Sequence, residues 1–156
     1  MPISPGVGVR LARVISTVVA VAALAVVPVA LSGCDNTVTG PSDYSPFREV
    51  DLRLGGGTTA EPGKTVTVNY IGWLYDPNKA EDKGLVFDTS FGQSTFTFVL
   101  GSGQVIPGWD KGVVGMQVGG LRRLVIPPSL AYGQTRQGPI PPNATLVFEI
   151  ELIDVR

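Results

Sequence analysis

Residues 65–75 read Thr-Val-Thr-Val-Asn-Tyr-Ile-Gly-Trp-Leu-Tyr, and this stretch decides the fold. Most of its residues are β-branched or aromatic. Val66, Val68 and Tyr70 fall on one face, whereas the residues between them are polar. A period of two in residues of this kind is typical of a β-strand. The stretch therefore predicts one long strand with an apolar face.

Five further segments have the composition of strands. Residues 47–54 alternate Val50, Leu52 and Leu54 with charged side chains, which is the pattern of a half-buried strand. In residues 145–155, apolar side chains expected to point inward alternate with acidic side chains expected to point outward. These inward residues are Leu146, Phe148, Ile150 and Leu152. The remaining strands are expected at residues 85–88, 95–100 and 121–126.

One short helix is expected where Pro107 precedes Trp109, Val113 and Met116, because proline suits the first turn and the apolar residues share a face. The charged residues 76–83 and the Gly/Pro-rich stretch 131–143 are expected to be loops. The strands do not alternate with helices. This element order predicts an α+β domain built on an antiparallel sheet.

The first residues have the organisation of a secretory signal. Arg10 and Arg13 precede an uncharged run at 14–30, and the run ends at Leu-Ser-Gly-Cys, residues 31–34. This ending resembles the lipobox of bacterial lipoproteins. The resemblance implies that residues 1–33 are removed and that Cys34 is lipidated as the first mature residue. An uncleaved apolar anchor is the alternative, and both interpretations place the chain outside the cytoplasm, tethered to a membrane.

The amino-acid composition bounds the folded domain and excludes several kinds of catalytic site. Residues 34–46 are mostly small or polar and are expected to form a flexible tether, which leaves 47–156 as one domain. The chain has no histidine and a single cysteine, so Ser-His-Asp triads, most catalytic zinc sites and a disulfide within the domain are excluded. The net charge of −1 gives no sign of nucleic-acid binding. We expect neither a metal nor a cofactor.

Six motifs, taken in order, resemble the FKBP-type peptidyl-prolyl isomerases. They are VNYIGWL (68–74), VFDTS (86–90), FTFVLG (96–101), VIPGW (105–109), AYG (131–133) and IPPNATLVF (140–148). The resemblance runs from about Glu49 to the C-terminus. It implies a curved antiparallel sheet of five to six strands wrapped around one short helix, with an apolar pocket between them.

The resemblance also implies a set of pocket residues, carried over position by position. They are Tyr70, Phe87, Asp88, Phe96, Val105, Ile106, Trp109, Tyr132, Ile140 and Phe148. Trp109 is expected to form the floor, and the Ile106 N–H and the Tyr132 hydroxyl to hold peptide carbonyls. Asp88 is expected to face the twisted carbonyl or to orient its neighbours. On spacing alone, such aromatic residues are more often core, and Phe98 is assigned to the core.

The implied activity is cis-trans isomerisation of X–Pro bonds in exported proteins, by a monomer that also binds the macrolide inhibitors of the family. A non-catalytic binding module or holdase chaperone on the same fold is the alternative. Two connections differ from the family pattern: residues 76–84 are longer than in the minimal member and residues 134–140 are shorter than in close bacterial relatives. Both are expected to border the pocket mouth.

Overall fold

The computed structural model describes residues 45–156. The expected signal at 1–33, Cys34 and all but the last two residues of the expected tether lie outside the described residues. Within residues 45–156, no helix is both long enough and apolar enough to cross a membrane.

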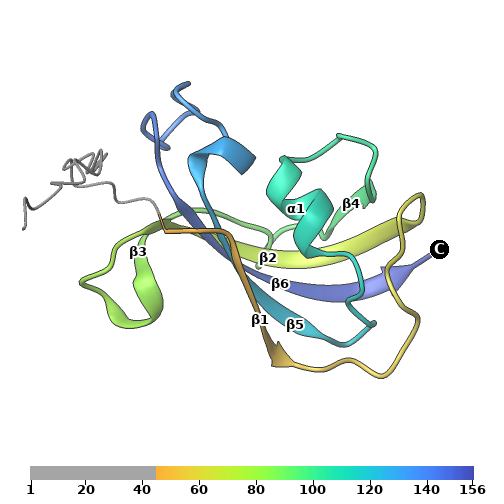
Figure 1. The fold of residues 1–156 in the computed structure, drawn as a ribbon. Helices are drawn as coiled ribbons and strands as arrows, with labels where there is room; N and C mark the ends of the chain where they lie inside the picture. The colour runs from red at the N-terminus through yellow and green to blue at the C-terminus, as the bar shows by residue number, and fades with distance from the viewer. Residues whose placement is uncertain (1–44) are drawn as a thin grey trace, which may run out of the picture. The chain divides into compact units, whose positions relative to one another are not determined.

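Six strands of the described residues form one antiparallel sheet. They are β1 (Arg48–Arg53), β2 (Thr65–Tyr75), β3 (Lys83–Thr89), β4 (Phe96–Val99), β5 (Leu121–Ile126) and β6 (Leu146–Val155). One α-helix, α1 (Pro107–Gly112), and two 3₁₀ turns, η1 (Ala80–Asp82) and η2 (Pro128–Leu130), complete the elements. The sheet order is β1-β5-β6-β2-β3, and β4 also pairs with β2 (Figure 1).

β2 is the strand on which the other elements converge. β6 pairs with one of its edges from Val66 to Leu74. β4 and β3 share the opposite edge, β4 across from residues 65–68 and β3 across from residues 71–75. The length predicted for β2 is what allows two short strands to follow one another along a single edge.

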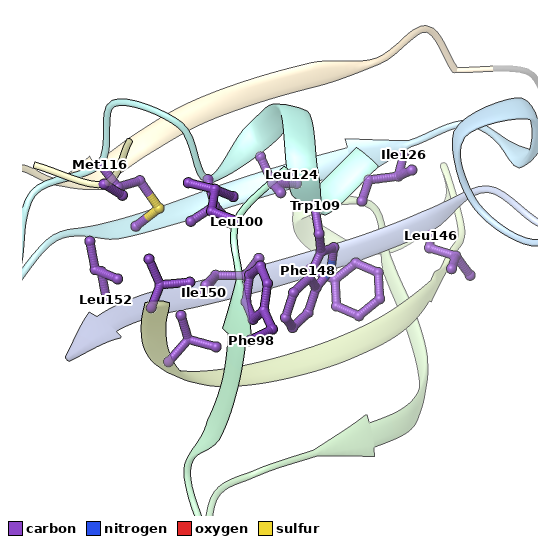
Figure 2. Packing of buried hydrophobic residues seen from close by; sticks show 14 of the residues in the cluster. Phe98, Leu100, Trp109, Met116, Leu124, Ile126, Leu146, Phe148, Ile150 and Leu152 are labelled. Carbon is purple, nitrogen blue, oxygen red and sulfur yellow. The ribbon is translucent and has the colours of Figure 1, made fainter. Parts of the chain in front are cut away.

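The core lies between the sheet and α1, which crosses one face of the sheet (Figure 1). Alternate residues of β6 point into it, and Leu146, Phe148, Ile150 and Leu152 are all buried. Trp109 extends from α1 toward Phe148 on β6 (Figure 2). The expected fold class, a curved antiparallel sheet around one short helix, is confirmed.

The half-buried first strand was a wrong prediction. β1 is exposed along its whole length, including Val50 and Leu52, and Leu54 lies exposed beyond its end. β1 is an edge strand that pairs only with β5 among the described residues. Polar contacts hold it there.

Arg122 of β5 supplies the main polar contact to β1. Its buried guanidinium bonds both carboxylate oxygens of Asp51, at 2.7 and 3.1 Å. The same group donates to the carbonyl oxygens of Gly112 and Val114, at the C-terminal end of α1. One side chain thus joins the edge strand, the sheet and the helix.

The connection at 76–84 is held by an ionic ring in which positive and negative groups alternate. Lys83 and Arg123 each contact both Glu81 and Glu149, with N···O distances of 2.7–2.8 Å. A further pair, Arg48 with Asp82, adds a contact from β1 at 2.8 Å. The expected loop therefore contains the turn η1, and its charges bind the sheet as well as solvent.

Candidate active site

A cavity of about 440 Å³ lies between α1 and the sheet, within the size range of ligand pockets. Its lining residues are Tyr70, Phe87, Asp88, Phe96, Gly103, Gln104, Val105, Ile106, Trp109, Tyr132 and Phe148. The structure thus brings together nine of the ten residues expected from the sequence. Asp88 is the one charged residue among those that line it.

Aromatic rings enclose the cavity around Trp109, which is only 4% exposed. Its ring meets those of Tyr70 and Phe148 edge to face, with centroids 5.1 and 5.2 Å apart. Phe96 meets it in the same way at 6.0 Å. Such T-shaped pairs are favourable beyond the area that they bury. The indole Nε1 is buried with no hydrogen-bond partner among the described residues, so Trp109 acts here as an apolar surface.

A β-bulge in β3 turns two consecutive residues toward the cavity. Gly72 of β2 pairs with Asp88 and the next residue, Trp73, pairs with Val86, so Phe87 is the extra residue. Neighbouring residues of a regular strand point to opposite faces, and a bulge re-aims one of them. Phe87 and Asp88 consequently both line the cavity.

Gly72 provides the room for this wall. A Cβ at this position would lie 2.6 Å from Cζ of Phe87 and 2.9 Å from Cε1 of Phe148. Both distances are too short for van der Waals contact. The two rings can therefore meet at a centroid distance of 5.5 Å only because residue 72 has no side chain.

The carboxylate of Asp88 has a partner on each oxygen. The Tyr70 hydroxyl donates to Oδ2 at 2.6 Å, and the Thr89 N–H donates to Oδ1 at 2.9 Å. Burial and the bond to Asp88 raise the pKa of Tyr70 well above its usual value. Burial and the Asp88 charge also raise the pKa of Tyr132. Both phenols are therefore protonated at neutral pH and can donate hydrogen bonds.

Two donors at the cavity have no acceptor among the described residues. One is the Tyr132 hydroxyl, and the other is the N–H of Ile106, the residue that precedes α1. The Ile106 carbonyl, in contrast, accepts from the N–H groups of Trp109 and Asp110. This arrangement fixes the backbone at Ile106 and leaves both donors for a ligand.

Asp110 of α1 shapes the loop that brings Ile106 to the cavity. Its carboxylate accepts hydrogen bonds from the N–H groups of Gly101 and Gly103, at 2.8 and 2.9 Å. Both glycines have positive φ, at 77° and 72°, which other residues rarely adopt. Gln104 closes the loop from the other side, where its Oε1 accepts from the Val99 N–H at 3.0 Å.

Sequence reasoning missed this loop as part of the site. The site residues expected from the sequence include no residue of the stretch 101–104 and do not include Asp110. Gly103 and Gln104 nevertheless line the cavity. The usable signal was a glycine turn followed, seven positions after Gly103, by an aspartate in the first turn of the helix, a residue type that often accepts from backbone N–H groups.

One residue expected at the pocket lies elsewhere. Ile140 is buried in the hydrophobic core and is not among the residues that line the cavity. The connections at 76–84 and 134–140 supply none of the lining residues, and their place at the mouth of the cavity stays a prediction. The first connection is bound instead to Arg123 and Glu149 by its ionic ring.

A short helix packed on a curved antiparallel sheet, with an aromatic cavity between them, defines a class of ligand-binding domain. The sequence model described as "FKBP-type peptidyl-prolyl cis-trans isomerase" matches residues 56–153. The chain therefore belongs to this family.

Known relatives agree with this assignment. Peptidyl-prolyl cis-trans isomerase FKBP53 of Arabidopsis thaliana is 49% identical over 109 residues, covering 69% of this chain and 22% of the relative. The crystal structure of FkpA from Escherichia coli is 41% identical with a TM-score of 0.60, covering 70% of this chain and 48% of that one. The crystal structure of AtFKBP13 is 36% identical with a TM-score of 0.60, covering 70% and 93%. The chain spans about a fifth of the length of the first curated relatives that it matches.

Proposed function

We propose that the domain catalyses cis-trans isomerisation of X–Pro bonds in polypeptides. The observation that carries this proposal is the aromatic cavity over Trp109, with the N–H of Ile106 and the hydroxyl of Tyr132 beside it, neither of which is bonded to another residue of 45–156. An apolar floor suits a prolyl ring. Donors at the cavity suit the peptide carbonyls on either side of the ring.

The chemistry needs no nucleophile. Rotation about a peptide bond has a barrier of about 18–20 kcal/mol because it breaks amide resonance, and uncatalysed X–Pro exchange takes tens to hundreds of seconds. The planar amide is the more polar form, since resonance moves charge from nitrogen to oxygen. A dry cavity destabilises this form relative to the twisted amide and so lowers the barrier.

Each lining group has a role in this proposal. Trp109 supports the prolyl ring, and Tyr70, Phe87, Phe96 and Phe148 exclude water around it, with Val105 beside them. The Ile106 N–H and the Tyr132 hydroxyl hold peptide carbonyls. Asp88 fixes the Tyr70 hydroxyl and places a negative charge at the cavity wall.

A protease-coupled proline assay on the full-length protein tests this function. We expect first-order acceleration of X–Pro exchange in a short peptide, proportional to protein concentration. Exchange no faster than background, with retained peptide binding by fluorescence anisotropy, would show instead a non-catalytic binding module or holdase. Peptides that vary the residue before proline would define the preference of the enzyme.

We propose that the same cavity binds the macrolide inhibitors of the family, as one ligand per monomeric domain. The relative from Aspergillus fumigatus, FK506-binding protein 4, is named for a ligand of this kind. Calorimetric titration should saturate at one macrolide per chain. The bound macrolide should abolish isomerase activity. Absence of both heat and competition would contradict a shared cavity.

We propose further that the protein is exported and lipid-anchored through Cys34, and that it assists the folding of exported proteins at the membrane. The support is the order of residues 10–34: two arginines, an uncharged apolar run and Leu-Ser-Gly-Cys. Intact-mass measurement of the membrane-extracted protein should show a lipidated chain that begins at Cys34, and Cys34→Ala should block maturation. An unmodified cysteine would contradict the anchor.

A further inference from the structure

Two residues of β2 lie in a gap between its neighbouring strands. β4 pairs with β2 as far as Val68, and β3 pairs with it from Ile71 onward. Asn69 and Tyr70 have no strand partner on this edge within residues 45–156. Backbone N–H and C=O groups inside a fold need hydrogen-bond partners, so other groups must replace the missing strand at this point.

The last residue of β3 and the residue after it supply these partners to Tyr70. The Tyr70 N–H donates to Oγ of Ser90 at 2.9 Å. The Tyr70 carbonyl accepts from the Ser90 N–H at 3.0 Å and from the Thr89 hydroxyl at 3.1 Å. Both backbone groups of Tyr70 are thus bonded on this edge, as they would be by a strand.

Asn69 fixes the direction of the Ser90 hydroxyl. Ser90 is only 5% exposed, and its Oγ donates to Oδ1 of Asn69 at 3.2 Å. A hydroxyl has one hydrogen to donate and two lone pairs that accept. Because the hydrogen points to Asn69, a lone pair is left for the Tyr70 N–H. Ser90 can therefore make both bonds at once.

These bonds reach the cavity through Tyr70. Neighbouring residues of a strand point to opposite faces, so Asn69 faces away from the cavity that Tyr70 lines. Ser90 is not among the lining residues either. Two positions before Ser90, however, Asp88 accepts from the Tyr70 hydroxyl at 2.6 Å. The segment 88–90 thus bonds Tyr70 at its N–H, its carbonyl and its phenol.

We propose that Ser90 is a positioning residue of the isomerase site. Its hydroxyl, oriented by Asn69, holds the backbone of Tyr70 at the place where the phenol meets the Asp88 carboxylate. A small displacement of a group in an active site lowers the rate strongly, so the pair depends on this support. The inference rests on the proposed isomerase function, and it names the residues that hold the Tyr70–Asp88 pair in place.

Four single variants of the full-length protein test the proposal. Ser90→Ala removes the acceptor for the Tyr70 N–H. Asn69→Ala removes only the group that orients the Ser90 hydroxyl, and Asn69→Asp retains an acceptor oxygen there. Thr67→Ala is the matched control, because it breaks a hydroxyl bond of 3.0 Å from β2 to Thr97 on β4 in which neither Tyr70 nor Ser90 takes part.

Three quantities are measured for each variant. The protease-coupled proline assay gives kcat/KM, and thermal melting gives the Tm. The third quantity is the ¹³C chemical shift of the Tyr70 Cζ in protein labelled at this carbon of tyrosine, which reports the hydrogen bond of the phenol. Tyr70→Phe assigns the signal, and Asp88→Val gives its position when the bond is absent.

We expect Ser90→Ala to lower kcat/KM by about fivefold to tenfold and to move the Tyr70 signal toward its position in Asp88→Val. Asn69→Ala should have a smaller effect in the same direction, and Asn69→Asp should restore the wild-type values. Thr67→Ala should leave kcat/KM and the Tyr70 signal unchanged, whatever it does to the Tm. In a Tyr70→Phe background, Ser90→Ala should cause no further loss of kcat/KM.

A lower Tm in Ser90→Ala, with kcat/KM and the Tyr70 signal at their wild-type values, would overturn the proposal, because Ser90 would then only close the gap in the sheet. An undiminished loss of kcat/KM in the Tyr70→Phe background would overturn it as well. If Ser90→Ala does not fold, the two Asn69 variants decide. The same Tyr70 signal in Asn69→Ala and Asn69→Asp would then count against the proposal, and a difference between them would support it.

The chemical shift separates the two proposals, because its measurement needs no turnover. If the wild type does not isomerise X–Pro bonds, the isomerase function fails. The Tyr70 signal in Ser90→Ala and Asn69→Ala still decides whether these two residues position the phenol.

Discussion

The Tyr70 hydroxyl and the Asp88 carboxylate lie 2.6 Å apart across the wall of the cavity, joined by a hydrogen bond from the phenol to Oδ2. The second oxygen of Asp88 accepts from the Thr89 N–H. The carboxylate is therefore held on both sides. In the proposed function, we expect Asp88 to act on a bound amide through its charge and through the fixed position of Tyr70.

We predict that Asp88→Val lowers kcat/KM by about tenfold or more and leaves the Tm within a few degrees. The substitution removes the charge and the acceptor for Tyr70 but little packing. Tyr70→Phe should be less severe, and the double variant should lose less than the sum of the two, because the residues act as a pair. A double-mutant cycle on kcat/KM measures this coupling. Unfolding of Asp88→Val, or full activity, would show that Asp88 is only a turn residue.

Trp109→Ala should lower activity strongly and destabilise the domain by about 3–5 kcal/mol, the range for a fully buried large aromatic. Trp109→Phe should retain much of the stability, because the indole Nε1 has no partner to lose among the described residues. Urea unfolding and the proline assay measure the two effects. A loss of stability in Trp109→Phe as large as that in Trp109→Ala would contradict this expectation.

Asp110→Ala should raise KM several-fold, by about fivefold to tenfold, with a smaller change in kcat. The reason is that the loop carrying the Ile106 N–H loses its two bonds to the carboxylate. Asp110→Asn retains one acceptor and should partly restore KM. Asp154→Ala removes an exposed carboxylate elsewhere and serves as control. Parallel losses of kcat and Tm, with no change in KM, would indicate a structural role only.

Gly72→Ala should reduce kcat/KM by about tenfold, because a methyl group there would displace the ring of Phe87 or that of Phe148. Gly56→Ala is the matched control, since nothing lies within 4 Å of the added Cβ. Steady-state kinetics and thermal melting compare kcat/KM and Tm between the Gly72→Ala and Gly56→Ala variants. Wild-type kinetics in Gly72→Ala would show that the aromatic wall adapts without cost to function.

The ionic ring predicts a pH dependence of stability. Bonds from Lys83 and Arg123 lower the pKa of Glu81 from 4.5 to about 2. A lowered pKa in the folded state means that the contribution of Glu81 is present above about pH 4.5 and is lost as the pH falls toward 2. Glu81→Gln should therefore flatten the Tm profile in this window, and added salt should do the same. Glu61→Gln should leave the profile unchanged. A wild-type profile in Glu81→Gln would contradict the ring.

Local alternation was enough to predict β2 and β6, because each strand turns a row of alternate apolar residues toward the core, as Val66 and Val68 do on β2 and Phe148 and Ile150 do on β6. It failed for β1. Val50 and Leu52 alternate in the same way, but burial depends on whether another layer covers the strand, and spacing does not report this. The pattern also could not show that Arg122 and Asp51 hold β1, since the two residues are 71 positions apart.

Nine of the ten residues transferred from the family motifs line the cavity, because those motifs follow elements whose positions the fold fixes. Ile140 does not, although its motif matches. Gly103, Gln104 and Asp110 were missed for a different reason. They are joined by hydrogen bonds between side chains and backbone N–H groups. A pattern of apolar residues does not predict such hydrogen bonds.

The bulge in β3 also sets protein stability against activity. Deletion of Phe87 would remove this bulge from the pairing with β2, and only the second register shift, between Trp73 and Tyr75, would remain. The shortened strand could still present the carboxylate of Asp88 to the cavity, but the ring of Phe87 would be lost. Selection for a more regular and more stable domain would therefore act against the irregularity that holds Phe87 and Asp88 on one wall.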